Sequence, residues 1–163
     1  MAKFPFKNPP SKIQSAAMKR AIHTPAFALF HAMGAGKTFT SINLAAARFL
    51  KGQIKHVIII VNPSSIKDVW DVELEKHCPV AYDLHIYNAG GQKPCAAWQR
   101  KWDKDENKLH FLVFGIEAFS QGNAIKVLAQ YITDHGKEGI KMLIDESTGI
   151  KNHSSTRSKK ITE

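Results

Sequence analysis

The sequence has little cysteine and no long run of apolar residues. Two cysteines, Cys78 and Cys95, stand among its 163 residues, and their spacing is not that of a zinc site. We therefore expect two reduced thiols and no disulfide framework. No apolar run approaches the roughly 20 residues of a membrane-spanning helix, and no signal peptide is recognisable. These absences predict a soluble, cytoplasmic protein that has no membrane partner.

Acidic residues are also scarce. The chain has 14 acidic against 23 basic residues and a formal net charge of +9. Such a balance favours a polyanion partner such as DNA or RNA, because phosphate contacts supply most non-specific affinity. A basic surface that only aids solubility is the alternative. Eight histidines are present, but none stands at metal-ligand spacing with cysteine or carboxylate, so we assign no metal beyond nucleotide-bound Mg²⁺.

Apolar segments of strand length alternate with segments of helical periodicity. This alternation predicts an α/β fold, in which a mostly parallel sheet carries helices on both faces. One predicted helix, capped by Ser65, has the apolar stripe Ile66, Val69, Trp70 and Leu74. The predicted strands are 26–30, 57–61, 84–87, 109–114 and 140–144, and the other predicted helices are 11–22, 38–50, one holding Trp98 and Trp102, and 124–135.

A glycine-containing loop joins the first predicted strand to the helix 38–50. Its sequence is His31-Ala-Met-Gly-Ala-Gly-Lys-Thr38, which fits a phosphate-binding loop except that His31 stands where the pattern has glycine. In such a loop the backbone of Met33, Gly34, Ala35 and Gly36 lies close to the phosphates. Lys37 meets the β- and γ-phosphate charge, and Thr38 binds Mg²⁺. The plain alternative is a glycine-containing turn before an amphipathic helix.

An acidic pair follows the last predicted strand. Asp145 and Glu146 come directly after the apolar segment 140–144. In a parallel sheet this end of the strand lies at the edge where a phosphate loop would sit. Asp145 is therefore predicted to hold Mg²⁺ and Glu146 to orient and deprotonate the attacking water, which makes Glu146, Asp145 and Lys37 the candidate catalytic residues for ATP hydrolysis. A solvated pair at a helix start is the alternative.

These motifs resemble those of superfamily 2 helicases, and most closely Swi/Snf-type ATPases and their phage-encoded relatives. The resemblance rests on the loop 33–38, the strand and proline at 57–63, and the segment Asp145-Glu-Ser-Thr-Gly-Ile-Lys-Asn152. It implies a RecA-like domain over 26–163, preceded by an arm and glutamine-motif helix over 1–25. It also implies that Gln14 reads adenine, and that a phage-encoded protein of this kind works in the host cell cytoplasm.

The resemblance further implies a track for nucleic acid. In superfamily 2 motors, the loops after two of the strands contact the sugar-phosphate chain without reading bases. The matching residues here are Ser64, Ser65, Lys67 and Gly115, with Ile116 a weaker candidate. A helix cap is the alternative role of Ser65. Trp98 and Trp102 are expected to face a core, with base stacking as the alternative.

The function predicted from the sequence is that of an ATP-binding first domain of a DNA helicase or translocase. We expect it to couple ATP hydrolysis to movement on nucleic acid only with a second RecA-like domain, which supplies an arginine to the γ-phosphate and which we do not find in this sequence. The alternative is a natural half-motor that binds nucleotide, DNA or a partner without catalysis. A small P-loop kinase is disfavoured by the Asp145–Asn152 segment.

Overall fold

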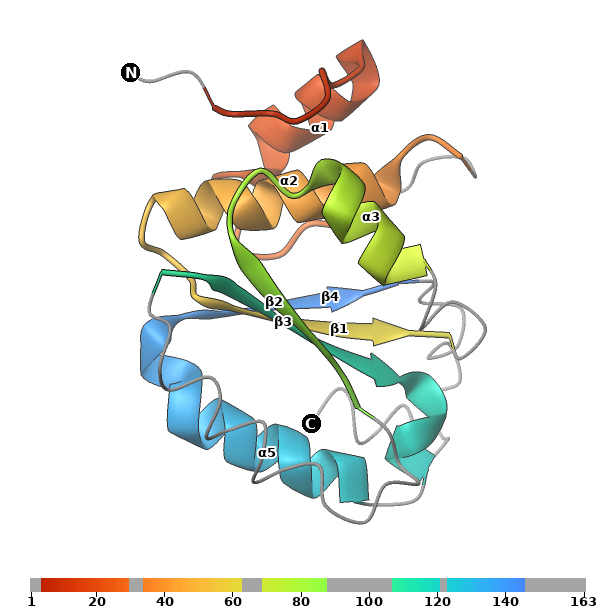
Figure 1. Ribbon diagram of the computed structural model, residues 1–163, viewed down its shortest axis with the longest axis vertical. Coiled ribbons are helices and arrows are strands. Elements are labelled where there is room, and N and C mark those ends of the chain that lie inside the picture. The colour runs from red at the N-terminus through yellow and green to blue at the C-terminus, as the bar shows by residue number, and fades with distance from the viewer. Residues whose placement is uncertain (1–3, 30–33, 63–68, 88–106, 121–122, 146–163) are drawn as a thin grey trace.

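A central sheet with helices on both faces forms the body of the molecule (Figure 1). The computed structural model describes residues 4–29, 34–62, 69–87, 107–120 and 123–145. Within these ranges the predicted α/β fold is confirmed. None of the helices in these ranges has both the length and the apolar character needed to cross a membrane.

The sheet has four parallel strands in the described part of the chain. They are β1 (His56–Val61), β2 (Tyr82–Ile86), β3 (Leu109–Gly115) and β4 (Ile140–Ile144), in the order β2-β3-β1-β4. β1 and β3 are buried along their whole length, as expected of inner strands covered on both faces. Because all strands run the same way, their carboxyl ends meet at one edge of the sheet.

The prediction of a strand over 26–30 is wrong for the residues that the structure describes. Residues 26–29 contain a bend and irregular backbone but no strand. The chain nevertheless passes close to the sheet there, since the Lys141 Nζ donates to the carbonyl of Pro25 at 3.1 Å. Apolar character does not lead to burial here, because residues 26–28 are exposed, Phe27 with 39% of its surface, and Leu29 is half-buried. Pairing with a sheet edge depends on tertiary contacts that a short apolar run does not specify.

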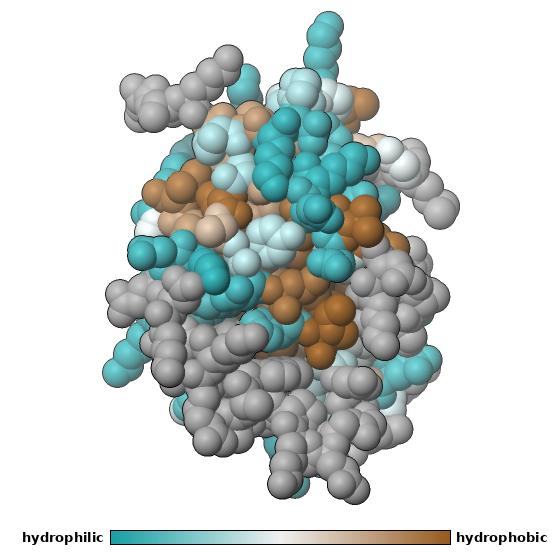
Figure 2. Space-filling view, in the orientation of Figure 1, coloured by the Kyte–Doolittle hydropathy of each residue, from teal (hydrophilic) through white to brown (hydrophobic). Residues whose placement is uncertain are grey.

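One face of the sheet is covered by α2 (Lys37–Leu50) and α3 (Val69–His77), and α1 (Lys12–Ala21) packs on the outer side of α2 (Figure 1). Trp70 and Leu74 of α3 are buried as predicted, but Val69 is 44% exposed and does not belong to the stripe. Figure 2 shows hydrophilic residues over the upper part of the face toward the viewer, with a hydrophobic area below them. Two of the four predicted stripe residues, Trp70 and Leu74, thus face the core, and Ile66 lies outside the described residues.

The opposite face is covered by α5 (Asn123–His135), with the short helices η2 (Ile116–Ser120) and η3 (Gly136–Glu138) at its two ends. The core between this face of the sheet and α5 includes Ile58, Ile60, Leu112, Phe114, Phe119, Leu128 and Tyr131. Alternate residues of β1 therefore point to opposite faces, since Val57, Ile59 and Val61 belong to the core on the other side. A continuous apolar strand thus supplies side chains to both cores, one under α2 and α3 and the other under α5.

The N-terminal arm packs on the domain through an aromatic ring and two polar side chains. The ring of Phe6 stacks on Phe39 of α2 with centroids 6.4 Å apart. The Lys7 ammonium and the Asn8 amide donate to carbonyls at the end of α3, each at 2.8 Å. Arg48 of α2 donates to the carbonyl of Ala21, the last residue of α1, and to that of Thr24 just after the helix. The arm and α1 are thereby fastened to the layer that carries the predicted phosphate loop.

Candidate nucleotide site

The predicted phosphate loop runs into the first residues of α2, and both of its glycines have the left-handed backbone conformation. Gly34 has φ +76° and Gly36 has φ +78°, values that side chains other than glycine rarely adopt. Gly36 is the N-cap of α2, and no side chain caps this helix end. The first turn of a 14-residue helix therefore presents its N–H groups and the positive end of its dipole toward the loop.

The side chain of Gln14 reaches this loop. Its Oε1 accepts from the Ser11 N–H at 2.8 Å, and the Ser11 hydroxyl accepts from the Gln14 N–H at 3.2 Å, which forms a capping box at the start of α1. The Gln14 Nε2 lies so close to Gly36 that a Cβ at that position would collide with it. The cap joins residues of one helical turn, whereas the packing of α1 on α2 places the amide on the loop.

Asp145 lies at the same edge of the sheet. It directly follows β4, and its N–H donates to the carbonyl of Ile60 at 2.9 Å, beside the end of β1. Figure 1 shows that the arrowheads of β1 and β4 and the first turn of α2 lie on one side of the molecule. The loop before α2 and the acidic end of β4 thus lie toward one side of the fold, as expected for a parallel sheet.

The other predicted site residues divide into two groups. Ala35, Lys37 and Thr38 are described and partly exposed at the start of α2, and Gly115 is buried at the end of β3, paired with Val61. Ile116, 8% exposed, begins η2 after it. Outside the described residues lie Met33, Ser64, Ser65, Lys67, Glu146, Trp98 and Trp102. Their roles, like those of the first group, stay predictions.

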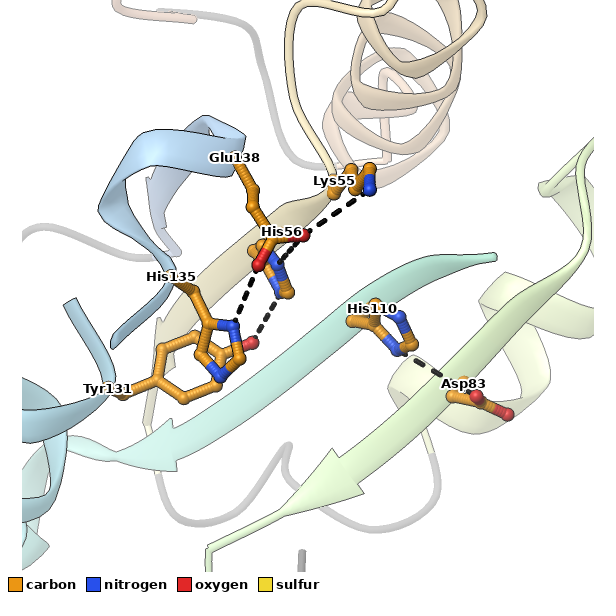
Figure 3. A network of polar contacts seen from close by, with 7 residues as sticks. All are labelled: Lys55, His56, Asp83, His110, Tyr131, His135 and Glu138. Carbon is orange, nitrogen blue, oxygen red and sulfur yellow. Dashed lines mark hydrogen bonds and ion pairs between the residues drawn. The ribbon is translucent and has the colours of Figure 1, made fainter. Parts of the chain in front are cut away.

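A second polar cluster lies at the opposite edge of the sheet, where the strands begin (Figure 3). The His56 Nδ1 is 2.6 Å from the Tyr131 hydroxyl, and the Glu138 carboxylate is 3.2 Å from the His135 Nδ1. Burial, together with His135 and His110, lowers the pKa of His56 to about 4. Burial likewise raises the pKa of Tyr131.

Sequence reasoning missed this cluster. His56 and His135 are 79 positions apart in the chain, and only the pairing of β1 with the strand after α5 brings them together. The one available signal was the spacing of His135 and Glu138, which is too short and too common to indicate a site. The neighbouring His110 instead faces Asp83, at 3.7 Å.

Comparison with known families matches residues 18–163 of this chain to the model of the SNF2-related domain. This chain belongs to the SNF2-related domain family. The match covers the loop before α2 and the acidic end of β4, and the family as a whole comprises helicase-like and translocase-like ATPase domains that use a nucleotide with Mg²⁺. The resemblance to Swi/Snf-type ATPases is thereby confirmed. No curated protein sequence gives a significant match to this SNF2-related chain.

Solved structures agree on the fold. The SWI2/SNF2 ATPase core of Sulfolobus solfataricus, in complex with dsDNA, superposes with a TM-score of 0.63 at 17% identity and covers 99% of this chain and 31% of that one. A nuclease-deletion mutant of the Type ISP restriction-modification enzyme LlaGI, in complex with a DNA substrate mimic, gives a TM-score of 0.60 at 18% identity. This match covers 93% of this chain and 16% of that one. This SNF2-related domain thus spans less than a third of either neighbour.

Proposed function

We propose that this SNF2-related domain binds ATP with Mg²⁺ at the carboxyl edge of its sheet and works as the first RecA-like half of a DNA translocase. The observation that carries the proposal is the pair of left-handed glycines at the start of α2, on the same side of the sheet as Asp145. Backbone N–H groups at a helix start and a carboxylate at a strand end suit a phosphate and its metal ion.

The roles of the residues follow from their places. Gly34 and Gly36 let the backbone approach the phosphates, because a Cβ would be strained at their φ values. Lys37 supplies a point charge at the first residue of α2. The capping box keeps the Gln14 amide beside the loop. There its Oε1 can accept a second hydrogen bond from the adenine edge, and its Nε2 can donate one.

Thr38 and Asp145 are the residues that would hold Mg²⁺, and Glu146 is the proposed base for the attacking water. Bound Mg²⁺ neutralises charge on the β- and γ-phosphates. Hydroxyl and carboxylate oxygens are suitable ligands for it. Asp145→Asn should therefore remove the Mg²⁺ dependence of ATP binding, whereas Glu146→Gln should leave binding intact and slow hydrolysis. The opposite pattern would exchange the roles of the two acids.

The test of the nucleotide site compares lysines at the two ends of α2. Lys37→Ala should weaken ATP binding by about 1.5–3 kcal/mol, because a charge-assisted contact is lost. Lys51→Ala is the matched control, since Lys51 is exposed at the far end of α2, and should leave the affinity unchanged. Titration calorimetry with ATP and Mg²⁺ measures both. Equal affinities of the Lys37→Ala variant and the parent protein would refute the site.

DNA is the proposed track. The two structural neighbours were solved with dsDNA and with a DNA substrate mimic, and the excess of basic residues suits a phosphate backbone. Contacts from Ser64, Ser65, Lys67 and Gly115 would hold the sugar-phosphate chain without reading bases. Binding to duplex DNA should be independent of sequence, fall steeply with salt, and weaken modestly in Lys67→Ala. Salt-independent binding would contradict the proposal.

A further inference from the structure

Three side chains at the edge opposite to the proposed ATP site direct metal-ligating atoms toward one another. They are His56, the first residue of β1, His135, the last residue of α5, and Glu138, the last residue of η3. One ligand atom from each lies within 4.8 Å of the others. Figure 3 shows both imidazole rings turned toward the carboxylate of Glu138.

The facing atoms can be named from the contacts. The Glu138 Oε2 is 3.7 Å from the His56 Nε2, and the Glu138 Oε1 is 3.2 Å from the His135 Nδ1. The two histidines are buried, with 2% and 8% of their surfaces exposed, so their rings are held in place by packing. The carboxylate is more accessible, with 39% of its side chain exposed, which provides a route for an ion from solvent.

Tyr131 orients the first of these ligands. Its hydroxyl is 2.6 Å from the His56 Nδ1 and can accept a hydrogen bond from that nitrogen. This bond leaves the lone pair of the Nε2 directed toward Glu138. Metal-binding histidines almost always have such a partner on the second ring nitrogen, and it fixes both the tautomer and the ring orientation. The cluster therefore contains two imidazoles, a carboxylate and an orienting hydroxyl.

We propose that His56 Nε2, His135 Nδ1 and the carboxylate of Glu138 bind one zinc ion, with water in the fourth position. Two imidazoles and one carboxylate form a known ligand set for Zn²⁺, whereas Mg²⁺ and Ca²⁺ prefer oxygen ligands. The ion fastens the end of α5 and η3 to the start of β1. It stabilises the folded domain, because the unfolded chain does not hold these residues together.

Lys55 separates this proposal from an ordinary ion-pair network. Its ammonium is 3.4 Å from the Glu138 Oε2, and 37% of its side chain is exposed. In a purely structural ion pair, Lys55 stabilises the cluster and its removal brings no new ligand. In a zinc site, Lys55 competes for the carboxylate and repels the ion, so its removal tightens zinc binding. Lys55→Gln should therefore tighten Zn²⁺ binding if the cluster is a zinc site, and should not do so if the cluster is only an ion-pair network.

The experiment measures Zn²⁺ affinity of the whole chain by competition with a chromophoric chelator, and follows Co²⁺ binding by its visible absorption. We expect His135→Ala and Glu138→Gln each to weaken Zn²⁺ binding at least about tenfold and to abolish the four-coordinate Co²⁺ spectrum. Glu138→Gln removes only an accessible charge, so its fold should persist, as checked by circular dichroism. Lys55→Gln should bind Zn²⁺ more tightly than the parent.

Matched controls are the histidines outside the cluster. His23 is exposed, and His110 lies beside His56 with ring centroids 5.3 Å apart but faces Asp83. His23→Ala and His110→Gln should retain the parent affinity. Zn²⁺, but not Mg²⁺, should raise the melting temperature of the parent and of both controls. Unchanged Zn²⁺ affinity in Glu138→Gln, or no tightening in Lys55→Gln, would overturn the proposal. ATP affinity is not among the measurements, so failure of the nucleotide site would not affect the result.

Discussion

Alanine substitution of the two loop glycines should have unequal effects, and the difference should measure the contact between Gly36 and Gln14. Both glycines have nearly the same left-handed φ, +76° and +78°. The backbone penalty for alanine is therefore the same at each, about 1–2 kcal/mol. Their surroundings differ, because a Cβ at Gly34 meets no atom of the described residues within 4 Å, whereas one at Gly36 collides with the Gln14 Nε2.

The collision adds a second cost at Gly36 alone. The Gln14 amide must move, and its hydrogen bond to the Ser11 N–H is lost from the capping box. Such a bond contributes about 0.5–1.5 kcal/mol. We therefore expect Gly34→Ala to lower the free energy of unfolding by about 1–2 kcal/mol and Gly36→Ala by about 1.5–3.5 kcal/mol.

The assay is urea unfolding followed by far-UV circular dichroism, without nucleotide, so that the result depends on the fold and not on ATP. A double-mutant cycle supplies the control. In a Gln14→Ala background the obstacle is absent, and Gly36→Ala should then cost no more than Gly34→Ala. Equal costs of the two glycine substitutions in the parent, or the same excess cost in the Gln14→Ala background, would refute the reasoning.

Three further predictions concern stability. Gly139→Ala should destabilise the domain by about 1–3 kcal/mol more than Gly52→Ala. Both glycines have positive φ, but a Cβ at Gly139 would meet backbone atoms of Gln53 and Ile54, whereas one at Gly52 would meet no described atom within 4 Å. Equal urea midpoints of the two variants would contradict this. Arg48→Met should cost about 1–3 kcal/mol in the same assay, since the carbonyls of Ala21, at the end of α1, and Thr24 lose the Arg48 guanidinium as a donor. Burial lowers the pKa of His77 below its ordinary 6.5, so the unfolded chain takes up the proton more readily and the free energy of unfolding should fall as the pH drops below 6.5. His77→Gln should reduce this pH dependence in urea titrations, and an unchanged dependence would show that His77 does not contribute.

The sequence by itself determined the elements whose signals are local. Glycine spacing before an amphipathic segment located the loop and α2, and helical periodicity over 11–22 indicated α1. Continuous apolar runs identified β1, β3 and β4. Each signal arises within one or two turns of chain, where backbone sterics and hydrogen bonding act between near neighbours.

Only the tertiary structure decided which distant residues meet. The parallel order β2-β3-β1-β4 brought the end of β4 to the side of the loop before α2, and it gathered His56 and His135 at the other edge. It also placed the Gln14 amide on Gly36 and left residues 26–29 outside the sheet. No local pattern encodes these results, because contacts between distant segments depend on strand order and on the packing of whole layers.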